Sequence, residues 1–160
     1  PSVLPTIARN ALAMSECRAV EVVIPEAETG KAEALADLAS SLAELPESGF
    51  AEIWVSHGSF PTLCALINGD RGWLMFLRYE GDAGFSSRNP DYAPSHAELE
   101  FMLSNGQVDR YPAEWTYSRA QILETLEYFA HTRHLPAALY WFNDSGDGAK
   151  LPDEDQTRQR

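Results

Sequence analysis

The chain has 160 residues, a formal net charge of −12 at pH 7 and a hydrophobic content of 44%. This length and this apolar content are typical of one folded domain with a buried core, and they exclude a disordered chain. The acidic balance argues against nucleic acid or an anionic membrane as a direct partner, because like charges repel. Solubility alone, or a basic protein partner, would account for the charge.

Cysteine content and hydropathy further restrict the class of protein to which the chain can belong. Cys17 and Cys64 are the only two cysteines, and their spacing matches neither a disulfide framework nor a zinc motif. No apolar run approaches the roughly 18 residues that a membrane span requires. The first residues are interrupted by Pro5 and Arg9 and match a signal peptide poorly. We therefore expect a cytoplasmic protein in a reducing compartment, without a membrane partner.

The first half of the chain predicts one strand, one helix and three further strands. A β-branched run at residues 18–24 indicates the first strand, which follows an N-terminal extension over residues 1–17. Leucines at helical spacing over residues 30–45 predict an amphipathic helix that Pro46 ends. Three apolar strands follow, at residues 50–57, 61–67 and 72–80. The links between these three strands have hairpin lengths, which predicts antiparallel pairing.

Two more strands are predicted after residue 95. Residues 96–103 alternate between apolar and polar side chains, which indicates a strand with one face on the core and the other in water. Asn105 and Gly106 turn the chain into a strand at residues 107–115, where Pro112 is typical of an edge strand or its end.

The second helix is the clearest element of the sequence. Ser118 and Gln121 form a capping-box pattern at its start, and Pro136 is expected to end it. The buried stripe consists of Ile122, Leu126 and Phe129. A last strand is expected at residues 137–142.

The predicted order is β-α-β-β-β-β-β-α-β. It describes an α+β fold with a mostly antiparallel sheet of about five to seven strands and two main helices. The domain is expected to occupy residues 18–142 and to be followed by an acidic, flexible tail at residues 143–160.

Patterns that would indicate catalysis or metal binding are weak. His131 and His134 at the end of the second helix do not match the H-E-x-x-H spacing of zinc proteases. Residues 143–154 place some oxygen ligands at calcium-loop positions but lack the flanking helices of an EF-hand. His57 and Ser59 share one turn, without the elbow that a nucleophilic serine needs. We therefore expect no metal, no cofactor and no enzymatic activity.

Residues 80–94 read as an irregular loop, although connections in compact domains are usually about four to six residues long. Between residues 80 and 114, seven side chains are acidic and two are basic. Aromatic side chains within an acidic rim are suited to capturing a basic protein, whereas a solvated acidic face over packed aromatics is the alternative. The predicted contact residues are Glu80, Asp82, Phe85, Asp91, Tyr92, Glu98, Glu100, Asp109, Tyr111, Glu114 and Trp115.

Four segments together carry a resemblance to a known family: GWLMFLRYEG, DAGFSSRNP, AELEFMLSNGQ and YSRAQILETLEYFAHTRHLPAALYW. They resemble the bacterial immunity proteins of polymorphic toxin systems, specifically the first-numbered (Imm-one) family, over roughly residues 18–142. In the last segment, the serine-started helix, Tyr128 and Phe129, Pro136 and Trp141 match most closely.

The resemblance implies a protein that acts by binding, without catalysis. Some members of the family neutralise deaminase toxins, so the implied partner is a cognate toxin domain, bound 1:1. A toxin that works on nucleic acid needs a basic substrate groove, which an acidic surface with aromatic side chains is suited to cover. Two alternatives stay open: a cytoplasmic adaptor domain with another partner, and a small hydrolase-like enzyme that uses Glu98 and Glu100.

Overall fold

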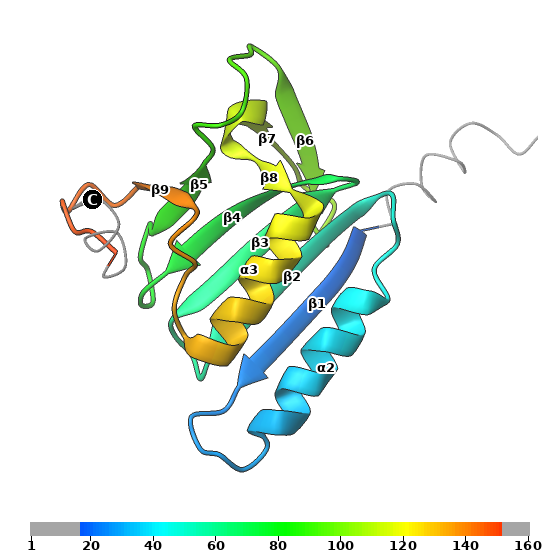
Figure 1. Cartoon of the computed structure of the whole chain (residues 1–160), viewed down its shortest axis with the longest axis vertical. Helices are drawn as coiled ribbons and strands as arrows, with labels where there is room; N and C mark the ends of the chain where they lie inside the picture. Colours follow the sequence, from blue (N-terminus) through cyan, green and yellow to red (C-terminus); the bar gives the residue numbers. More distant parts are fainter. Residues whose placement is uncertain (1–16, 152–160) are drawn as a thin grey trace, which may run out of the picture.

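The computed structural model describes residues 17–151 of the chain. The elements of these residues, in chain order, are β1 (Cys17–Ile24), α2 (Lys31–Ala43), β2 (Phe50–His57), β3 (Thr62–Asn68), β4 (Arg71–Leu77), β5 (Phe85–Arg88), β6 (Glu98–Met102), β7 (Val108–Pro112), the 3₁₀ turn η1 (Ala113–Trp115), β8 (Tyr117–Ser118), α3 (Arg119–Thr132) and β9 (Tyr140–Asn143). This arrangement is shown in Figure 1. It confirms the predicted α+β fold and element order and adds two short strands, β5 and β8.

A seven-stranded sheet forms the centre of the molecule. Its strands follow the order β1-β2-β3-β4-β5-β9, and β8 pairs with β4 beside this path. β1 runs parallel to β2, whereas β2, β3, β4, β5 and β9 pair with one another in antiparallel fashion. The predicted antiparallel pairing of the three central strands is therefore correct, because their short turns leave no room for a crossover.

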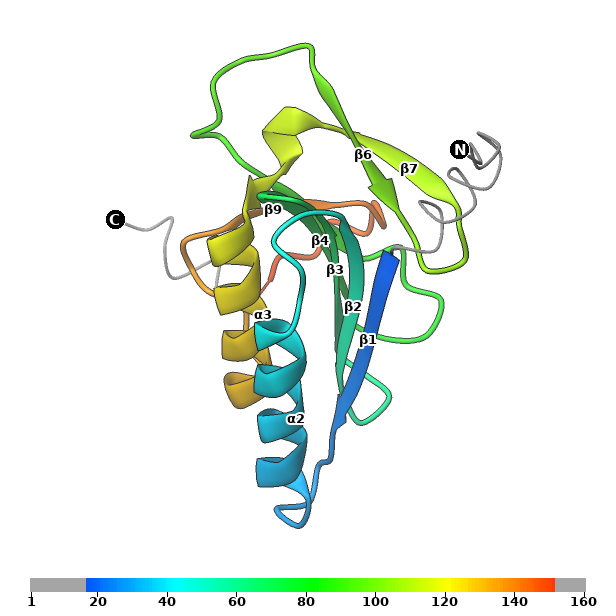
Figure 2. The same ribbon diagram turned by 90° about the vertical axis from the view of Figure 1, so that its right-hand side faces the viewer.

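Both helices pack on one face of this sheet, as Figure 2 shows. β2 alternates strictly, so Ala51, Ile53 and Val55 face the helices and are buried. α3 contributes the predicted stripe of Ile122 and Leu126 with Phe129 to the same core. Apolar alternation on the strand and helical spacing on α3 therefore meet in one hydrophobic layer.

The second face of the sheet is covered by the β6–β7 hairpin, which forms a separate two-stranded sheet (Figure 2). Phe101 of β6 packs with Cys64 and Leu66 of β3 and with Trp73 of β4 in a second hydrophobic cluster. This cover explains why β3 and β4 are apolar on both faces: each of their faces lies against another layer. β7 ends at Pro112, where η1 replaces the last residues of the predicted strand.

The start of α3 has the predicted capping box. The hydroxyl of Ser118 accepts a hydrogen bond from the backbone N–H of Gln121, and the Gln121 side chain accepts one from the backbone N–H of Ser118. The helix ends at Thr132, earlier than the prediction from Pro136, because Arg133 adopts a left-handed conformation with φ of 66°. Its N–H then bonds to the carbonyl of Phe129 and closes the last turn.

The structure corrects the prediction of an irregular loop over residues 80–94. β5 occupies its middle, pairs with β4 on one side and with β9 on the other, and divides it into two shorter connections. The sequence of β5 is short and mostly polar, so its strand character comes from its two neighbours and not from its own pattern.

The beginning of the expected flexible tail is also held against the domain. The side-chain amide of Asn143 donates hydrogen bonds to Asp147 and to the carbonyl of Ala149, and its oxygen accepts from Ser145. Leu151 is buried in the main core. The rest of the tail, residues 152–160, and most of the N-terminal extension, residues 1–16, lie outside the described residues.

Alanine at Gly84 should destabilise the fold more than alanine at Gly81. Both glycines have positive φ, and replacing either should cost about 1–2 kcal/mol for that reason alone. A Cβ atom at Gly84 would also overlap the carbonyl oxygen of Phe76 and lie 2.7 Å from Leu77 Cδ2, whereas Gly81 has nothing within 4 Å. Overpacking adds about 1–3 kcal/mol, so urea denaturation should separate the two variants by that amount. Equal losses would contradict the close packing of β5 on β4.

Candidate functional site

The eleven predicted contact residues do not form one surface. Phe85 is 1% exposed and belongs to the main core, where it packs against Phe76 with ring centroids 6.5 Å apart. It cannot serve as an exposed aromatic contact, because β5 turns its side chain toward the helices. Phe85 is therefore removed from the predicted contact set.

Asp82 is a structural residue as well. Its side chain is 0% exposed and pairs with Arg78, Nε to Oδ2 at 2.8 Å and Nη2 to Oδ1 at 2.9 Å. It also accepts bonds from the backbone N–H groups of Arg78 and Gly84. The hydrogen bonds from Arg78 are the main reason that the pKa of Asp82 is lowered to about 2. Arg78 reaches Asp147 too, so this buried ion pair joins the β4–β5 turn to the chain that follows β9.

Several of the other predicted acids are on the surface. Glu80 and Asp91 are exposed in the loops on either side of β5. Glu98 and Glu100 lie on the outer face of β6, and Glu100 forms an exposed ion pair of 2.7 Å with Arg110 of β7. The enzyme alternative requires Glu98 and Glu100 to line a pocket, but both side chains face solvent on the β6–β7 hairpin.

Two of the predicted aromatic residues, Tyr111 and Trp115, lie in and directly after the β6–β7 hairpin. Tyr111 stacks on Trp73 with ring centroids 4.1 Å apart and planes 7° from parallel, and the Trp115 ring lies 6.1 Å from that of Tyr111. Burial is the main reason that the pKa of the Tyr111 hydroxyl is raised, and the negative charge of Asp109 raises it further. The hydroxyl donates a hydrogen bond to the Asp109 carboxylate. Tyr92 lies apart from this stack and packs under the guanidinium of Arg71. These contacts fix Tyr111 and Trp115 in place.

Sequence reasoning missed the residues that complete this surface. The guanidinium of Arg88 lies 3.5 Å from the Trp115 ring centroid and 4.9 Å from that of Phe142. Phe142 is 54% exposed and Tyr140 is 47% exposed, and both face the same side of the edge strand β9. Alternation within the segment YWF could have separated Trp141 from its two neighbours, but it does not say which side is covered.

We define the aromatic surface as Arg88, Tyr111, Trp115, Tyr140 and Phe142. Two acidic side chains border it: Asp109 bonds to Tyr111, and Asp144 accepts a bond of 2.6 Å from Ser86. Glu114, the residue before Trp115 in η1, is half-buried. Burial lowers the pKa of Arg88, and the charge of Asp144 acts in the opposite direction. The result is a group of partly exposed aromatic rings around one cation, with carboxylates at its edge.

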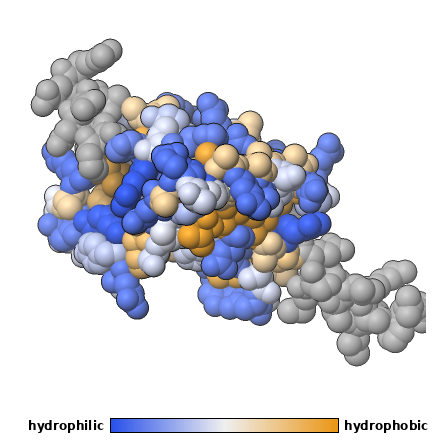
Figure 3. All heavy atoms as spheres, turned by 90° about the horizontal axis from the view of Figure 1, so that it is seen from below, coloured by the Kyte–Doolittle hydropathy of each residue, from blue (hydrophilic) through white to orange (hydrophobic). Residues whose placement is uncertain are grey.

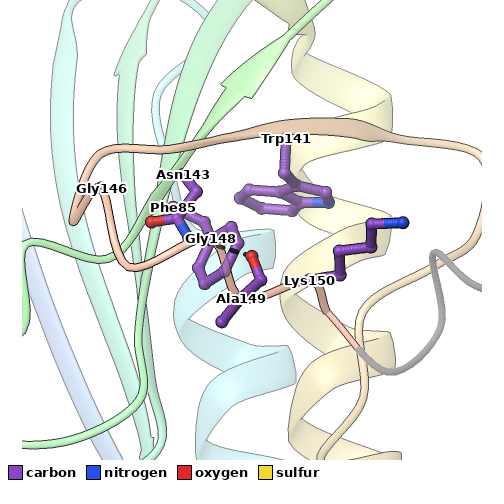
Figure 4. A pocket seen from close by; sticks show the side chains of 7 residues that line it. All are labelled: Phe85, Trp141, Asn143, Gly146, Gly148, Ala149 and Lys150. Carbon is purple, nitrogen blue, oxygen red and sulfur yellow. Dashed lines mark hydrogen bonds between the residues drawn. The ribbon is translucent and has the colours of Figure 1, made fainter.

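Two pockets lie outside the aromatic surface. One, of about 340 Å³, lies beside β9 and is lined by Phe85, Trp141, Asn143, Gly146, Gly148, Ala149 and Lys150. Figure 4 shows the Phe85 and Trp141 rings on its wall and the Asn143 amide bonded to Ala149. Among these lining side chains only Lys150 is ionisable, so no acid–base pair converges there.

The other pocket, of about 410 Å³, lies between the start of α2 and the end of α3 and is lined by Pro25, Glu26, Lys31, His57, His131, Thr132 and Arg133. Figure 3 views the molecule from this end and shows apolar residues surrounded by hydrophilic ones. His57 Nε2 donates to the carbonyl of Phe129 at 2.7 Å, and burial lowers the pKa of His57. His57 is therefore a neutral link between β2 and α3.

Within the described residues 17–151, no three His, Cys, Asp or Glu side chains are placed to hold a metal ion. No helix in the same part of the chain is long and apolar enough to cross a bilayer.

The family model of immunity protein Imm1 matches residues 19–143. The matched region includes the whole aromatic surface and all eleven predicted contact residues. A comparison with curated proteins gave no match.

Asp82→Asn should destabilise the protein at neutral pH by about 1.5–3 kcal/mol, the contribution of a charged hydrogen bond. The loss should shrink in acid. An unfolded aspartate titrates near a pKa of about 3.9, and the folded pKa is about 2, so the ionised Asp82 stabilises the fold above about pH 4 and ceases to do so as the pH falls to 2. Urea denaturation across this range measures both effects.

The exposed Asp91 provides the matched control for this variant. Asp91→Asn should change the free energy of unfolding at pH 7 by less than about 0.5 kcal/mol. An Asp82→Asn variant as stable as the wild type at pH 7 would contradict a structural role for the buried ion pair.

Proposed function

The chain belongs to the Imm1 family of immunity proteins, and from this premise we propose that it neutralises a cognate toxin that acts on nucleic acid, most simply a deaminase. It does so in the cytoplasm as a 1:1 complex, by binding and without chemistry of its own. The aromatic surface and the acids around it cover the basic region where the toxin holds its substrate.

The observation that carries this proposal is the aromatic surface. Rings of Trp, Tyr and Phe around an arginine are the residue types that dominate binding energy at protein interfaces. Trp115 and Tyr111 are held in place by the packing of the hairpin, so binding orders few of their rotamers. Phe142 and Tyr140 present large exposed rings on an edge strand, where a partner can bury them.

The charge of the chain supports a basic partner. The net charge is −12, and three exposed acids are Asp91 in the loop after β5, Glu98 at the start of β6 and Asp144 directly after β9. A toxin that acts on nucleic acid must attract phosphates, so its substrate groove is basic. Opposite charges accelerate the encounter of the two proteins, while the buried rings slow their separation.

The first experiment uses the toxin domain that is encoded beside the gene of this chain. We expect co-purification as a 1:1 complex, protection of cells that express the toxin, and competition between nucleic acid and this chain for the toxin. Asp91→Lys with Glu98→Lys should lower the association rate about tenfold or more at low salt and flatten its salt dependence.

The matched control is Glu33→Lys with Asp37→Lys on α2, which changes the net charge equally but lies on the face of the sheet opposite the β6–β7 hairpin. This control should slow association much less. A folded chain that neither binds the toxin nor protects cells would contradict the proposal and favour an adaptor with another partner. Binding that leaves nucleic acid bound to the toxin would contradict coverage of the substrate groove.

A further inference from the structure

We propose that Arg88 binds a carboxylate of the toxin at the centre of the interface, an inference that rests on the proposed function. The partner surface is then basic overall but carries one aspartate or glutamate opposite Arg88. This pairing makes Arg88 a determinant of which toxin is recognised, in addition to the general attraction between acidic and basic surfaces.

Two aromatic rings lie against the Arg88 guanidinium. Trp115 approaches with its ring centroid 3.5 Å away, and the Phe142 centroid is 4.9 Å away. The rings come from η1 and β9, so the guanidinium of β5 is fixed by elements that are distant in sequence. These rings hold the guanidinium in position, and a partner can reach its N–H groups, which point outward in the plane of the group.

Within residues 17–151, Nη1 is the one guanidinium nitrogen of Arg88 that donates hydrogen bonds. Nη1 donates to the hydroxyl of Ser86 at 2.9 Å and to the carbonyl of Ser87 at 2.8 Å. Across residues 17–151, Nε and Nη2 of Arg88 have no hydrogen-bond acceptor, and the only buried side-chain nitrogen or oxygen without a partner is Trp73 Nε1. Nε and Nη2 of Arg88 are therefore open to solvent and available to a partner.

The nearby carboxylates do not satisfy these donors. Asp144 accepts from Ser86, and Asp109 accepts from Tyr111 and from Gln107, so each is held by its own neighbours. No ion pair joins Arg88 to any acid among the residues that the structure describes. The cation is oriented by its surroundings but its charge is not neutralised by direct contact.

A carboxylate is the protein group that fits this arrangement. Nε–H and Nη2–H form two parallel donors, and the two oxygens of Asp or Glu accept from both in the same plane. A carbonyl of the partner offers these donors a single oxygen without a negative charge, so it compensates the cation less well than a carboxylate does. Association with a protein that lacked the acid would bury Arg88 without a counter-charge, which is unfavourable and so discriminates against other basic proteins.

Arg88→Gln and Arg88→Lys test this pairing in the full chain with the purified toxin domain. Gln removes the charge, whereas Lys keeps the charge and loses the planar fork. We expect both variants to weaken the complex roughly 100-fold, mainly through faster dissociation, as for other buried charge pairs at interfaces. Phe142→Ala, at an exposed site, should also weaken it by releasing the guanidinium. Thermal unfolding of the free variants identifies any loss of fold.

Arg110→Gln is the matched control, because Arg110 is an exposed arginine of the hairpin that pairs with Glu100 within the chain. It should change affinity by about threefold or less. In parallel, each exposed Asp and Glu of the toxin is replaced by alanine and tested against wild type and Arg88→Gln. One toxin acid should lose its effect when Arg88 is already replaced, which identifies the pair.

Two results would overturn the inference while leaving the proposed function intact. One is a folded Arg88→Gln variant that binds the toxin with wild-type affinity, while Asp91→Lys with Glu98→Lys still slows association. The other is a weakened Arg88→Gln complex in which no toxin acid couples to Arg88. Failure of the wild-type chain to bind the toxin at all would instead reject the proposed function.

Discussion

Burial of the central strands on both faces is the constraint on which the rest of this structure depends. Every residue of β3 except Asn68 is buried, so both faces of the strand must be covered. The helices can cover only one face, because α2 and α3 follow strands that pack them on the same side. The β6–β7 hairpin covers the other face through Phe101 and Tyr111, which lie over Cys64, Leu66 and Trp73. A cost of several kcal/mol for exposing these side chains holds the hairpin in place.

The same packing creates the surface that we assign to recognition. Tyr111 stacks on Trp73, η1 follows directly, and this places Trp115 beside Arg88 of β5. β9 then adds Phe142 by pairing with β5. Residues that are far apart in the sequence are thus assembled by the core and need little reordering on binding. A rigid, aromatic surface of this kind is what limits dissociation at protein interfaces.

Charge and packing have separate roles in this molecule. In the function that we propose, the exposed acids of the loops and of β6 attract the partner at a distance, and salt weakens this effect. Asp82 acts only inside the fold, where its pairing with Arg78 holds the turn that leads into β5. Counting the acidic residues between positions 80 and 114 could not distinguish these roles. The distinction depends on whether a neighbouring cation reaches the carboxylate in the folded state. The buried ion pair therefore supports the aromatic surface indirectly, by positioning the strand that carries Arg88.

The sequence by itself determined the two helices, the central strands, the capping box of α3 and the resemblance to the immunity family. Periodicity reports which side chains share a face, and these elements are long enough to show a clear period. Only the tertiary structure decided that Phe85 and Asp82 are internal, that β5 is a strand, and that Phe142 and Tyr140 are exposed. A strand of four residues is too short to show a reliable hydrophobic period. Even where the period shows which side chains share a face, it does not reveal which other element covers that face. Which face remains open is set by contacts between elements distant in the chain.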